Sequence, residues 1–261
     1  MNVALIQLNA GINKQQNIQN TCANVEKAID KGAEFILLPE IFNYRGPLTG
    51  IDLFNEIAEE IPGESLIPLM ELAKNAGVNI LAGSIYERPE KGNKVYNTSV
   101  IINDSGDIIC KYRKINLFRA IIDGKEVDES NIYEAGDKSV TCKLNNMKVG
   151  LSICFDLRFP ELYREYFNEG VDMIVIPSSF TSKTGKLHWE ALLRARAIEN
   201  YCYVLAPNQF GIDGNGVETY GHSMTIDPQG KVISVLKDQE EGILISNLSF
   251  ENQSYIPIIN Q

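Results

Sequence analysis

Cys154 is the residue whose position first suggests chemistry. It closes a short apolar run, residues 149–154, and a turn and a predicted helix beginning at Pro160 follow directly. A thiol at the end of a strand, beside the backbone N–H groups of a turn, has the exposure and the donors that a nucleophile needs. The alternative is a structural cysteine buried at a strand end, since free cysteine is among the most buried residue types.

Two further residues, Glu40 and Lys114, follow predicted strands and could act with this thiol. Glu40 comes directly after the apolar run 35–39, where burial would raise its pKa and let it serve as a general base. The Lys114 ammonium would keep a thiolate and a carboxylate from repelling each other, and it would stabilise an oxyanion. Taken singly, each residue is better explained as a solvated surface charge.

A cysteine–histidine dyad is the competing catalytic interpretation. The chain has 2 histidines, His188 and His222. The first opens a predicted helix, where it suits a helix cap, and the second stands at the start of a predicted strand. Neither position indicates an imidazole beside the thiol, so a carboxylate base is favoured.

Alternating strands and helices must position these residues. Apolar residues spaced by three and four predict helices, and short apolar runs bounded by turn residues predict strands. In the first half this pattern predicts helices at 13–31 and 66–75 and strands at 3–8, 35–38, 79–85, 99–102 and 107–113. In the second half it predicts helices at 160–169 and 188–200 and strands at 149–154, 173–176, 202–206, 222–226, 231–235 and 242–248.

The two halves of the chain also contain short stretches of similar sequence. Residues 32–39, Gly-Ala-Glu-Phe-Ile-Leu-Leu-Pro, match residues 170–177, Gly-Val-Asp-Met-Ile-Val-Ile-Pro, and residues 99–109 match 223–233 in the same order. This order predicts a duplicated β-α-β unit whose two sheets pack together, with chance alternation as the alternative. Residues beyond the strand ends would then converge on one crevice.

Composition restricts the classes of partner. The 261 residues carry a formal net charge of −10 without a basic stripe, which disfavours nucleic acid and anionic membranes. The 5 cysteines form no C-x-x-C pair and have no zinc-ligand spacing, so we expect no metal site and a reducing compartment. No apolar run approaches the ~18 residues of a membrane span, and the first residues do not resemble a signal peptide. We therefore expect a cytoplasmic protein.

Three stretches of the sequence resemble the conserved blocks of a known family. Residues 37–40, Leu-Leu-Pro-Glu, 112–118, Tyr-Arg-Lys-Ile-Asn-Leu-Phe, and 150–161, Gly-Leu-Ser-Ile-Cys-Phe-Asp-Leu-Arg-Phe-Pro-Glu, look like the three signature blocks of the nitrilase superfamily of carbon-nitrogen hydrolases. The blocks stand in the family's order. The resemblance implies an α/β fold, a four-layer αββα sandwich with internal pseudo-duplication, that commonly pairs into a homodimer. We expect one domain over 1–248 and an apolar tail over 249–261 that straps the dimer.

The resemblance also implies a catalytic set. Glu40 would be the base, Lys114 the oxyanion stabiliser and Cys154 the nucleophile, with no metal or organic cofactor. In the family a second glutamate lies between the lysine and the cysteine. Here Glu129 resembles it and would orient Lys114, whereas the alternative, Glu126, fits less well.

Four residues are predicted to bind the substrate. Phe155, Phe180 and Thr184 are pocket candidates, and Tyr44, just past the base, is a candidate for the entrance. Ordinary packing explains the two phenylalanines equally well. Arg158 would either reach a substrate carboxylate or form a salt bridge that stabilises the turn.

The activity implied by the resemblance is that of an amidase acting on a small linear amide, with acid and ammonia released through a cysteine thioester. The segments 178–190, 194–204 and 220–224 are similar to those of the Nit subgroup, whose members hydrolyse deaminated glutathione or ω-amides of α-keto acids. The alternatives are a nitrilase or carbamoylase with the same catalytic set, or a non-catalytic binding protein of the same fold. Residues 211–216 are predicted to be a mobile loop and not a phosphate cradle.

Overall fold

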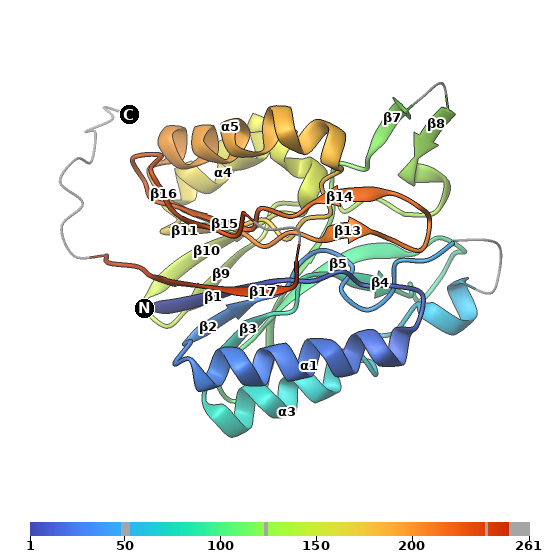
Figure 1. Ribbon diagram of the computed structural model, residues 1–261, viewed down its shortest axis with the longest axis horizontal. Coiled ribbons are helices and arrows are strands. Elements are labelled where there is room, and N and C mark those ends of the chain that lie inside the picture. The colour runs from blue at the N-terminus through green and yellow to red at the C-terminus, as the bar shows by residue number, and fades with distance from the viewer. Residues whose placement is uncertain (48–52, 123–124, 238–239, 251–261) are drawn as a thin grey trace.

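The computed structural model describes residues 1–47, 53–122, 125–237 and 240–250. Within these ranges two mixed β-sheets lie face to face, and a pair of helices covers each outer face (Figure 1). One pair is α1 (Lys14–Asp30) and α3 (Ile67–Ala76), and the other is α4 (Pro160–Glu169) and α5 (Ser182–Asn200). The predicted four-layer αββα sandwich is therefore confirmed.

The first sheet has seven strands in the order β17-β1-β2-β3-β5-β4, with β6 paired to β5. Its centre is parallel, since β1, β2 and β3 run in one direction, and β5 and β17 pair antiparallel on either side. The strands are β1 (Asn2–Gln7), β2 (Phe35–Leu37), β3 (Asn79–Leu81), β4 (Ile85–Glu87), β5 (Tyr96–Ile102), β6 (Ile108–Arg113) and β17 (Gly242–Asn247).

The second sheet has six strands in the order β16-β15-β12-β11-β10-β9. It repeats the plan of the first, because β10, β11 and β12 are parallel and β9 and β15 pair antiparallel at their flanks. This repetition agrees with the predicted pseudo-duplication. The strands are β9 (Thr141–Leu144), β10 (Met147–Leu151), β11 (Met173–Val175), β12 (Tyr203–Ala206), β15 (Met224–Ile226) and β16 (Val232–Val235).

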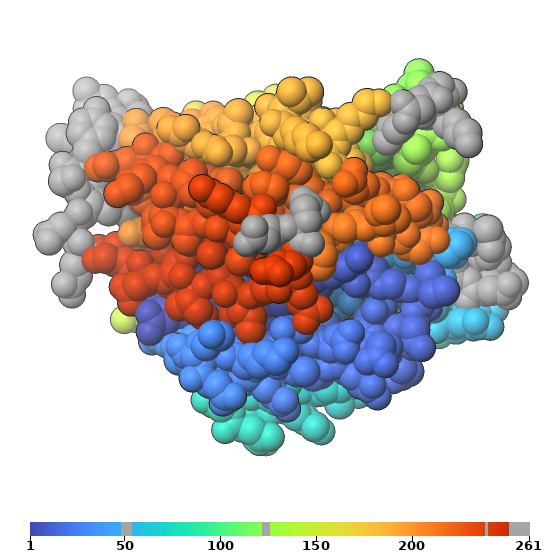
Figure 2. Space-filling model, viewed as in Figure 1, coloured from blue at the N-terminus to red at the C-terminus, as the bar shows by residue number. Residues whose placement is uncertain are grey.

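The central strands are mainly apolar because both of their faces are buried. Along β1, Ala4 and Ile6 pack in the cluster beneath α1 and α3, whereas Val3 and Leu5 pack between the two sheets. A third cluster fills the space between the second sheet and its helices around Trp189. Each strand end is thereby held by packing on two sides. β17 crosses back to pair with β1, so the two ends of the described chain lie together (Figure 2).

Several predicted boundaries were wrong. The run 79–85 is two strands, β3 and β4, because the chain turns at Gly83, whose φ is 37°. The strand predicted over 149–154 ends at Leu151, and Cys154 begins the 3₁₀-helix η3 (Cys154–Arg158). The helix predicted over 188–200 begins at Ser182 instead.

Two hairpins were not predicted. One is β7 (Arg119–Ile122) with β8 (Lys125–Asp128), followed by the short helix η2 (Glu129–Asn131). The other is β13 (Phe210–Ile212) with β14 (Glu218–Tyr220), so residues 211–216, predicted to be a mobile loop, form the end of β13 and the turn that follows it. Thr219 at the second hairpin bridges Thr181 before α5. The remaining short element is the π-helix η1 (Leu53–Ile57).

The beginning of the predicted C-terminal tail packs on the sandwich. The Ser249 carbonyl accepts a hydrogen bond of 2.6 Å from the Tyr203 hydroxyl, and the Phe250 ring lies 5.2 Å from the Tyr203 ring. Residues 251–261, which carry most of the predicted dimer strap, lie outside the described residues. Among the described helices, none has the length and apolar character needed to cross a membrane.

Candidate active site

Cys154 stands where the chain leaves β10 and turns into η3. Its φ of 47° is in the left-handed region, which is uncommon for a residue with a side chain. Two hydrogen bonds hold this turn: the Cys154 N–H donates to the Pro177 carbonyl at 3.0 Å, and the Ile153 N–H donates to Asp156 at 2.9 Å. The strained conformation is thus held by hydrogen bonds from the backbone N–H groups of Cys154 and the residue before it.

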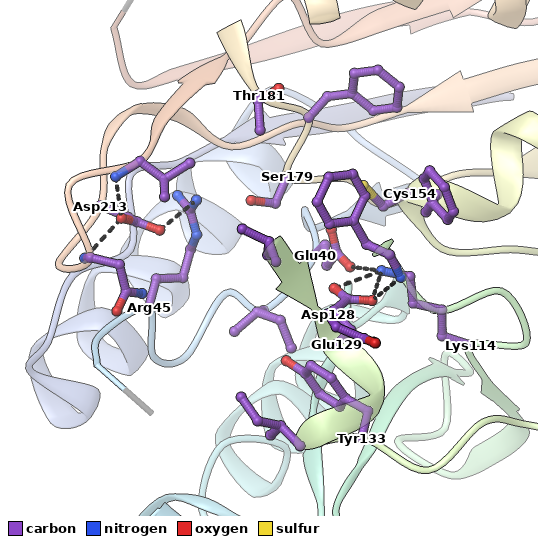
Figure 3. Close-up of a pocket in the computed structure, with 18 of the residues that line it drawn as sticks. Glu40, Arg45, Lys114, Asp128, Glu129, Tyr133, Cys154, Ser179, Thr181 and Asp213 are labelled. Carbon is purple, nitrogen blue, oxygen red and sulfur yellow. Dashed lines mark hydrogen bonds and ion pairs between the residues drawn. The ribbon is translucent and has the colours of Figure 1, made fainter. Parts of the chain in front are cut away.

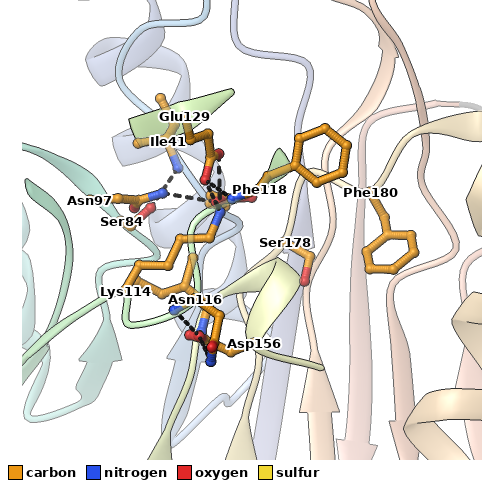
Figure 4. A network of polar contacts seen from close by, with 12 residues as sticks. Ile41, Ser84, Asn97, Lys114, Asn116, Phe118, Glu129, Asp156, Ser178 and Phe180 are labelled. Carbon is orange, nitrogen blue, oxygen red and sulfur yellow. Dashed lines mark hydrogen bonds and ion pairs between the residues drawn. The ribbon is translucent and has the colours of Figure 1, made fainter. Parts of the chain in front are cut away.

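Asp156 anchors the turn to the first half of the chain. Its buried carboxylate accepts a hydrogen bond of 2.7 Å from the Tyr112 hydroxyl on β6. It also accepts two bonds of 2.9 Å from Asn116, one from the backbone N–H and one from the side-chain amide (Figure 4). Burial raises the pKa of Asp156, and the bond from Tyr112 opposes that rise. One carboxylate therefore joins the cysteine turn to the segment that carries Lys114.

Glu40 lies beyond the end of β2 and is buried. Its neighbour Ile41 has a φ of 49°, and the Ile41 N–H donates to Ser84 Oγ at 2.9 Å. Gln209 Nε2 donates to the Glu40 carbonyl at 3.0 Å, and Asn97 Nδ2 donates to Glu40 Oε1 at 2.9 Å. The backbone and the carboxylate of Glu40 are therefore fixed by separate partners.

Lys114 follows β6, and its side chain is 1% exposed. The Lys114 N–H donates to the Asn97 carbonyl at 2.9 Å. At the other end of the side chain, Nζ lies 3.0 Å from Glu40 Oε1 and 3.0 and 3.1 Å from the two carboxylate oxygens of Glu129. A buried ammonium thus bridges two carboxylates from different segments (Figure 3).

Glu129 begins η2, directly after the β7–β8 hairpin. Besides Lys114, its carboxylate accepts a hydrogen bond of 2.7 Å from the Phe118 N–H. Glu126, the alternative weighed for this position, pairs instead with Arg119 at 2.8 Å, and both of those side chains are exposed. The structure therefore brings Glu129, and not Glu126, to the lysine.

Burial and charge set the protonation of this cluster. Burial, followed by the nearby Glu40 carboxylate, raises the pKa of the Cys154 thiol, and Lys114 opposes that rise. Burial alone would lower the pKa of Lys114, but the carboxylates of Glu129 and Glu40 raise it well above its ordinary value. Burial raises the pKa of Glu129 against the effect of Lys114. The favoured resting arrangement is a protonated thiol beside a charged lysine.

These groups open on one pocket of about 290 Å³. Phe155, Phe180 and Thr184 line it, and the Phe155 ring packs edge-on against Phe118 with centroids 5.1 Å apart. Tyr44 is not among the described residues that line the pocket, and its half-buried side chain packs in the cluster around Tyr133. Figure 3 shows Cys154 and Arg45 on opposite sides of this space.

Sequence reasoning missed part of the lining. Arg158 was considered for a turn salt bridge, but no described acid pairs with it, and it lies against His188 and the rings of Phe155 and Phe180. Arg45 could have been predicted to line the pocket from its position, because it is a charged residue that follows soon after Glu40. The lining residues of the two hairpins, β7–β8 and β13–β14, show no periodic pattern that would have predicted their strands. The unpredicted lining residues include Arg45, Tyr86, Asp128, Ile132, Tyr133, Ser179, Thr181, Asp213, Asn215 and Val217.

No group of three or more potential metal ligands from histidine, cysteine, aspartate and glutamate occurs among the described residues. The arrangement that they do contain is a thiol, a carboxylate and an ammonium on three chain segments around one cavity. Such a set can form and break a bond to a polarised carbon without an imidazole base. The polar chemistry of the pocket is therefore carried by these side chains and the backbone around them.

Comparison with known proteins gives the class. The family model described as carbon-nitrogen hydrolase matches residues 2–254, and the chain belongs to this family. The chain is similar to omega-amidase NIT2 of Mus musculus, with 38% identity over 99% of this chain and 94% of the relative. It is also similar to deaminated glutathione amidase of Dictyostelium discoideum, with 36% identity over 99% of this chain and 92% of the relative.

A solved structure shares the architecture. The crystal structure of Saccharomyces cerevisiae Nit3, a member of branch 10 of the nitrilase superfamily, matches with a TM-score of 0.84 and 32% identity. The match covers 96% of this chain and 90% of Nit3. The resemblance to the nitrilase superfamily and the predicted fold class are therefore confirmed.

Proposed function

We propose that this chain is an amidase that hydrolyses the carbon–nitrogen bond of a small linear amide, with Cys154 as its nucleophile. One observation carries the proposal: the Lys114 ammonium lies 3.0 Å from both Glu40 and Glu129 in the pocket that Cys154 lines. Membership of the carbon-nitrogen hydrolase family and the similarity to named amidases support the same reaction.

The first half of the reaction forms a thioester. Glu40 accepts the thiol proton as Cys154 Sγ attacks the amide carbon, which is needed because burial keeps the thiol protonated. The developing oxyanion is held by the Lys114 ammonium and the Phe155 backbone N–H. Glu129 orients the ammonium through its paired carboxylate oxygens. The proton then passes from Glu40 to the leaving nitrogen, and ammonia departs when the substrate is a primary amide.

The second half releases the acid. Glu40 takes a proton from a water molecule, the resulting hydroxide attacks the thioester carbon, and the thiolate leaves and is reprotonated. The same Lys114 and Phe155 donors hold the second oxyanion. The scheme returns every group to its starting state and uses no metal or organic cofactor.

The substrate class follows from the pocket and the relatives. Aromatic walls at Phe155 and Phe180, with Thr184 beside them, fit a short carbon chain, and Arg158 offers a cation for a terminal carboxylate. The relatives are named omega-amidase and deaminated glutathione amidase. We accordingly propose an ω-amide of an α-keto acid or deaminated glutathione. A cytoplasmic location and a homodimer, in which the C-terminal tail after residue 248 straps the partner, belong to the same proposal.

Nitrile hydrolysis, carbamoyl hydrolysis and simple binding use the same fold, so the test must separate them. Purified protein is incubated with α-ketoglutaramate, deaminated glutathione, an N-carbamoyl amino acid and a simple nitrile, and the released amine or ammonia is measured. Cleavage of the first two, with an acyl group on Cys154 detected by mass spectrometry, is the expected result. Cys154→Ala should abolish turnover, whereas Cys22→Ala on α1, a half-buried thiol, should retain it. Undiminished release by Cys154→Ala would defeat the scheme.

A further inference from the structure

Arg45 is a buried cation of the pocket to which the proposed mechanism gives no role. It lies a few residues beyond Glu40 on the same segment, lines the pocket and is 5% exposed. Its Nη2 donates to Asp213 Oδ2 at 3.1 Å. In Figure 3 this pair stands on one side of the pocket and Cys154 on the other.

The β13–β14 hairpin holds Arg45 in place. The Arg45 carbonyl accepts a hydrogen bond of 2.9 Å from the Gly214 N–H, and the Arg45 N–H donates to the Gly11 carbonyl at 3.0 Å. The Asp213 carboxylate is itself oriented by bonds of 2.9 Å from the backbone N–H groups of Asn215 and Val217. The guanidinium is therefore pinned by the backbone at one end and by a fixed carboxylate at the other.

One nitrogen of this guanidinium is left over. Arg45 Nη1 is buried and has no hydrogen-bond partner among the described residues. Burying a charged donor without a partner is unfavourable, and native structures rarely keep such a group without a reason. A ligand oxygen in the pocket would complete its hydrogen bonding.

A second guanidinium, that of Arg158, also lines the pocket. Arg158 ends η3, the helix that Cys154 begins, and it lies 5.8 Å from the Phe155 ring and 5.3 Å from the Phe180 ring. The two cations thus belong to different chain segments: Arg158 to that of the nucleophile, and Arg45 to that of the base, Glu40.

In the proposed reaction, these two chain segments contact different parts of the substrate. The acyl group becomes bonded to Cys154 Sγ, whereas the amine departs with the proton that Glu40 delivers. The acyl portion is therefore expected beside Arg158 and the amine portion beside Glu40 and Arg45. A negative group on the departing amine would lie where Arg45 Nη1 lacks a partner.

We infer that Arg45 is a specificity-determining residue that binds a carboxylate carried by the leaving amine, so the preferred substrates are N-acylated amino acids or short peptides. This inference rests on the proposed function. The acyl–nitrogen bond breaks, the acyl–sulfur bond forms, and the amine leaves as an amino acid or peptide after taking the thiol proton through Glu40. Deaminated glutathione, whose amine portion ends in a carboxylate, has this chemistry, whereas a primary ω-amide does not.

The test uses γ-amides of 2-oxoglutarate that share one acyl group. The amine portions are glycylglycine, glycylglycinamide, which replaces the carboxylate by a neutral amide, and ammonia. For the unaltered protein, kcat/KM should be at least about tenfold higher for the glycylglycine amide than for the glycylglycinamide amide. Arg45→Met should reduce that ratio to about one, mainly through a higher KM for the glycylglycine amide.

A second variant guards against misfolding, because Arg45→Met leaves the Asp213 carboxylate buried without its cation. Arg45→Met combined with Asp213→Asn removes both charges and should show the same loss of preference. A ratio that stays high in the double variant, or a ratio near one in the unaltered protein, would overturn the inference while cleavage of the amides upheld the proposed function. Cleavage of none of the three amides by the unaltered protein would overturn both.

Discussion

Lys114 and Glu129 face each other so that the lysine Nζ lies 3.0 and 3.1 Å from the two oxygens of one carboxylate. Their segments reach this contact from different elements, since Lys114 follows β6 and Glu129 follows the β7–β8 hairpin. The contact matters because Nζ also lies 3.0 Å from Glu40, and an ammonium bound to one carboxylate alone would have more freedom to move. Glu129 therefore holds in place the cation that, in the proposed mechanism, contacts Glu40 and stabilises the oxyanion.

Lys114→Met should destabilise the fold as well as remove activity. The substitution leaves the carboxylates of Glu40 and Glu129 without their cation, and breaking a buried ion pair costs about 3–5 kcal/mol. Urea unfolding would show the loss as a lower transition midpoint. Lys111→Met is the matched control, because Lys111 is 42% exposed and its partner Glu87 keeps two hydrogen bonds from Arg113 when the lysine is removed. The control should lose no more than about 1 kcal/mol, and equal losses in the two variants would contradict the buried-bridge argument.

Glu40→Gln should make the Cys154 thiol easier to ionise while slowing hydrolysis. The Glu40 carboxylate is, after burial, the next cause of the raised pKa of Cys154, so neutralising it lets Lys114 favour the thiolate. The pH midpoint of iodoacetamide alkylation at Cys154, followed by mass spectrometry, should move to lower pH. Amide hydrolysis should fall by about 10²–10⁴-fold, because the proposed general base is gone. Glu126→Gln, at an exposed glutamate, should change neither measurement, and an unchanged or higher midpoint in Glu40→Gln would refute the electrostatic account.

The position of the catalytic candidates was predictable because each follows a strand that the sequence predicts. Glu40 follows β2 and Cys154 follows β10, whose apolar runs are plain in the sequence, whereas Lys114 follows β6, a partly exposed strand that the sequence also predicts. Helix α4 was predicted with its observed ends, since Pro160 suits the first helical position and Gly170 adopts the left-handed conformation at its end. In both cases, the strand ends and the ends of α4, the signal comes from residues that are neighbours in the sequence.

The rest depends on contacts that no local pattern carries. Helix α5 begins at Ser182, earlier than predicted, because its first turn contains Gly185, a poor helix former that hides the helix in the sequence. The packing requires glycine there, since a Cβ would lie 2.4 Å from the Tyr220 ring. The turn around Cys154 is held by Asp156 through Tyr112 and Asn116, which come from another segment. The lining residue Arg45 likewise owes its place to the β13–β14 hairpin, whose glycine-rich turn hides the strand alternation.

Gly83→Ala should damage the site through the backbone that carries Glu40. A Cβ at Gly83 would lie 2.0 Å from the Pro39 carbonyl oxygen and 2.9 Å from the Leu38 carbonyl oxygen, so the end of β2 would have to move. Gly77→Ala is the matched control, because Gly77 also has a positive φ of 66° but a Cβ there meets nothing within 4 Å. The control should lose about 1 kcal/mol of unfolding free energy at unchanged kcat. Gly83→Ala should lose more unfolding free energy and should lower kcat by about 10²-fold, since a displaced Glu40 carboxylate would no longer reach the thiol proton that the proposed mechanism assigns to it. Unfolding curves and amide hydrolysis measured on both variants check this, and full activity in Gly83→Ala would show that Glu40 does not depend on the close approach of these two segments.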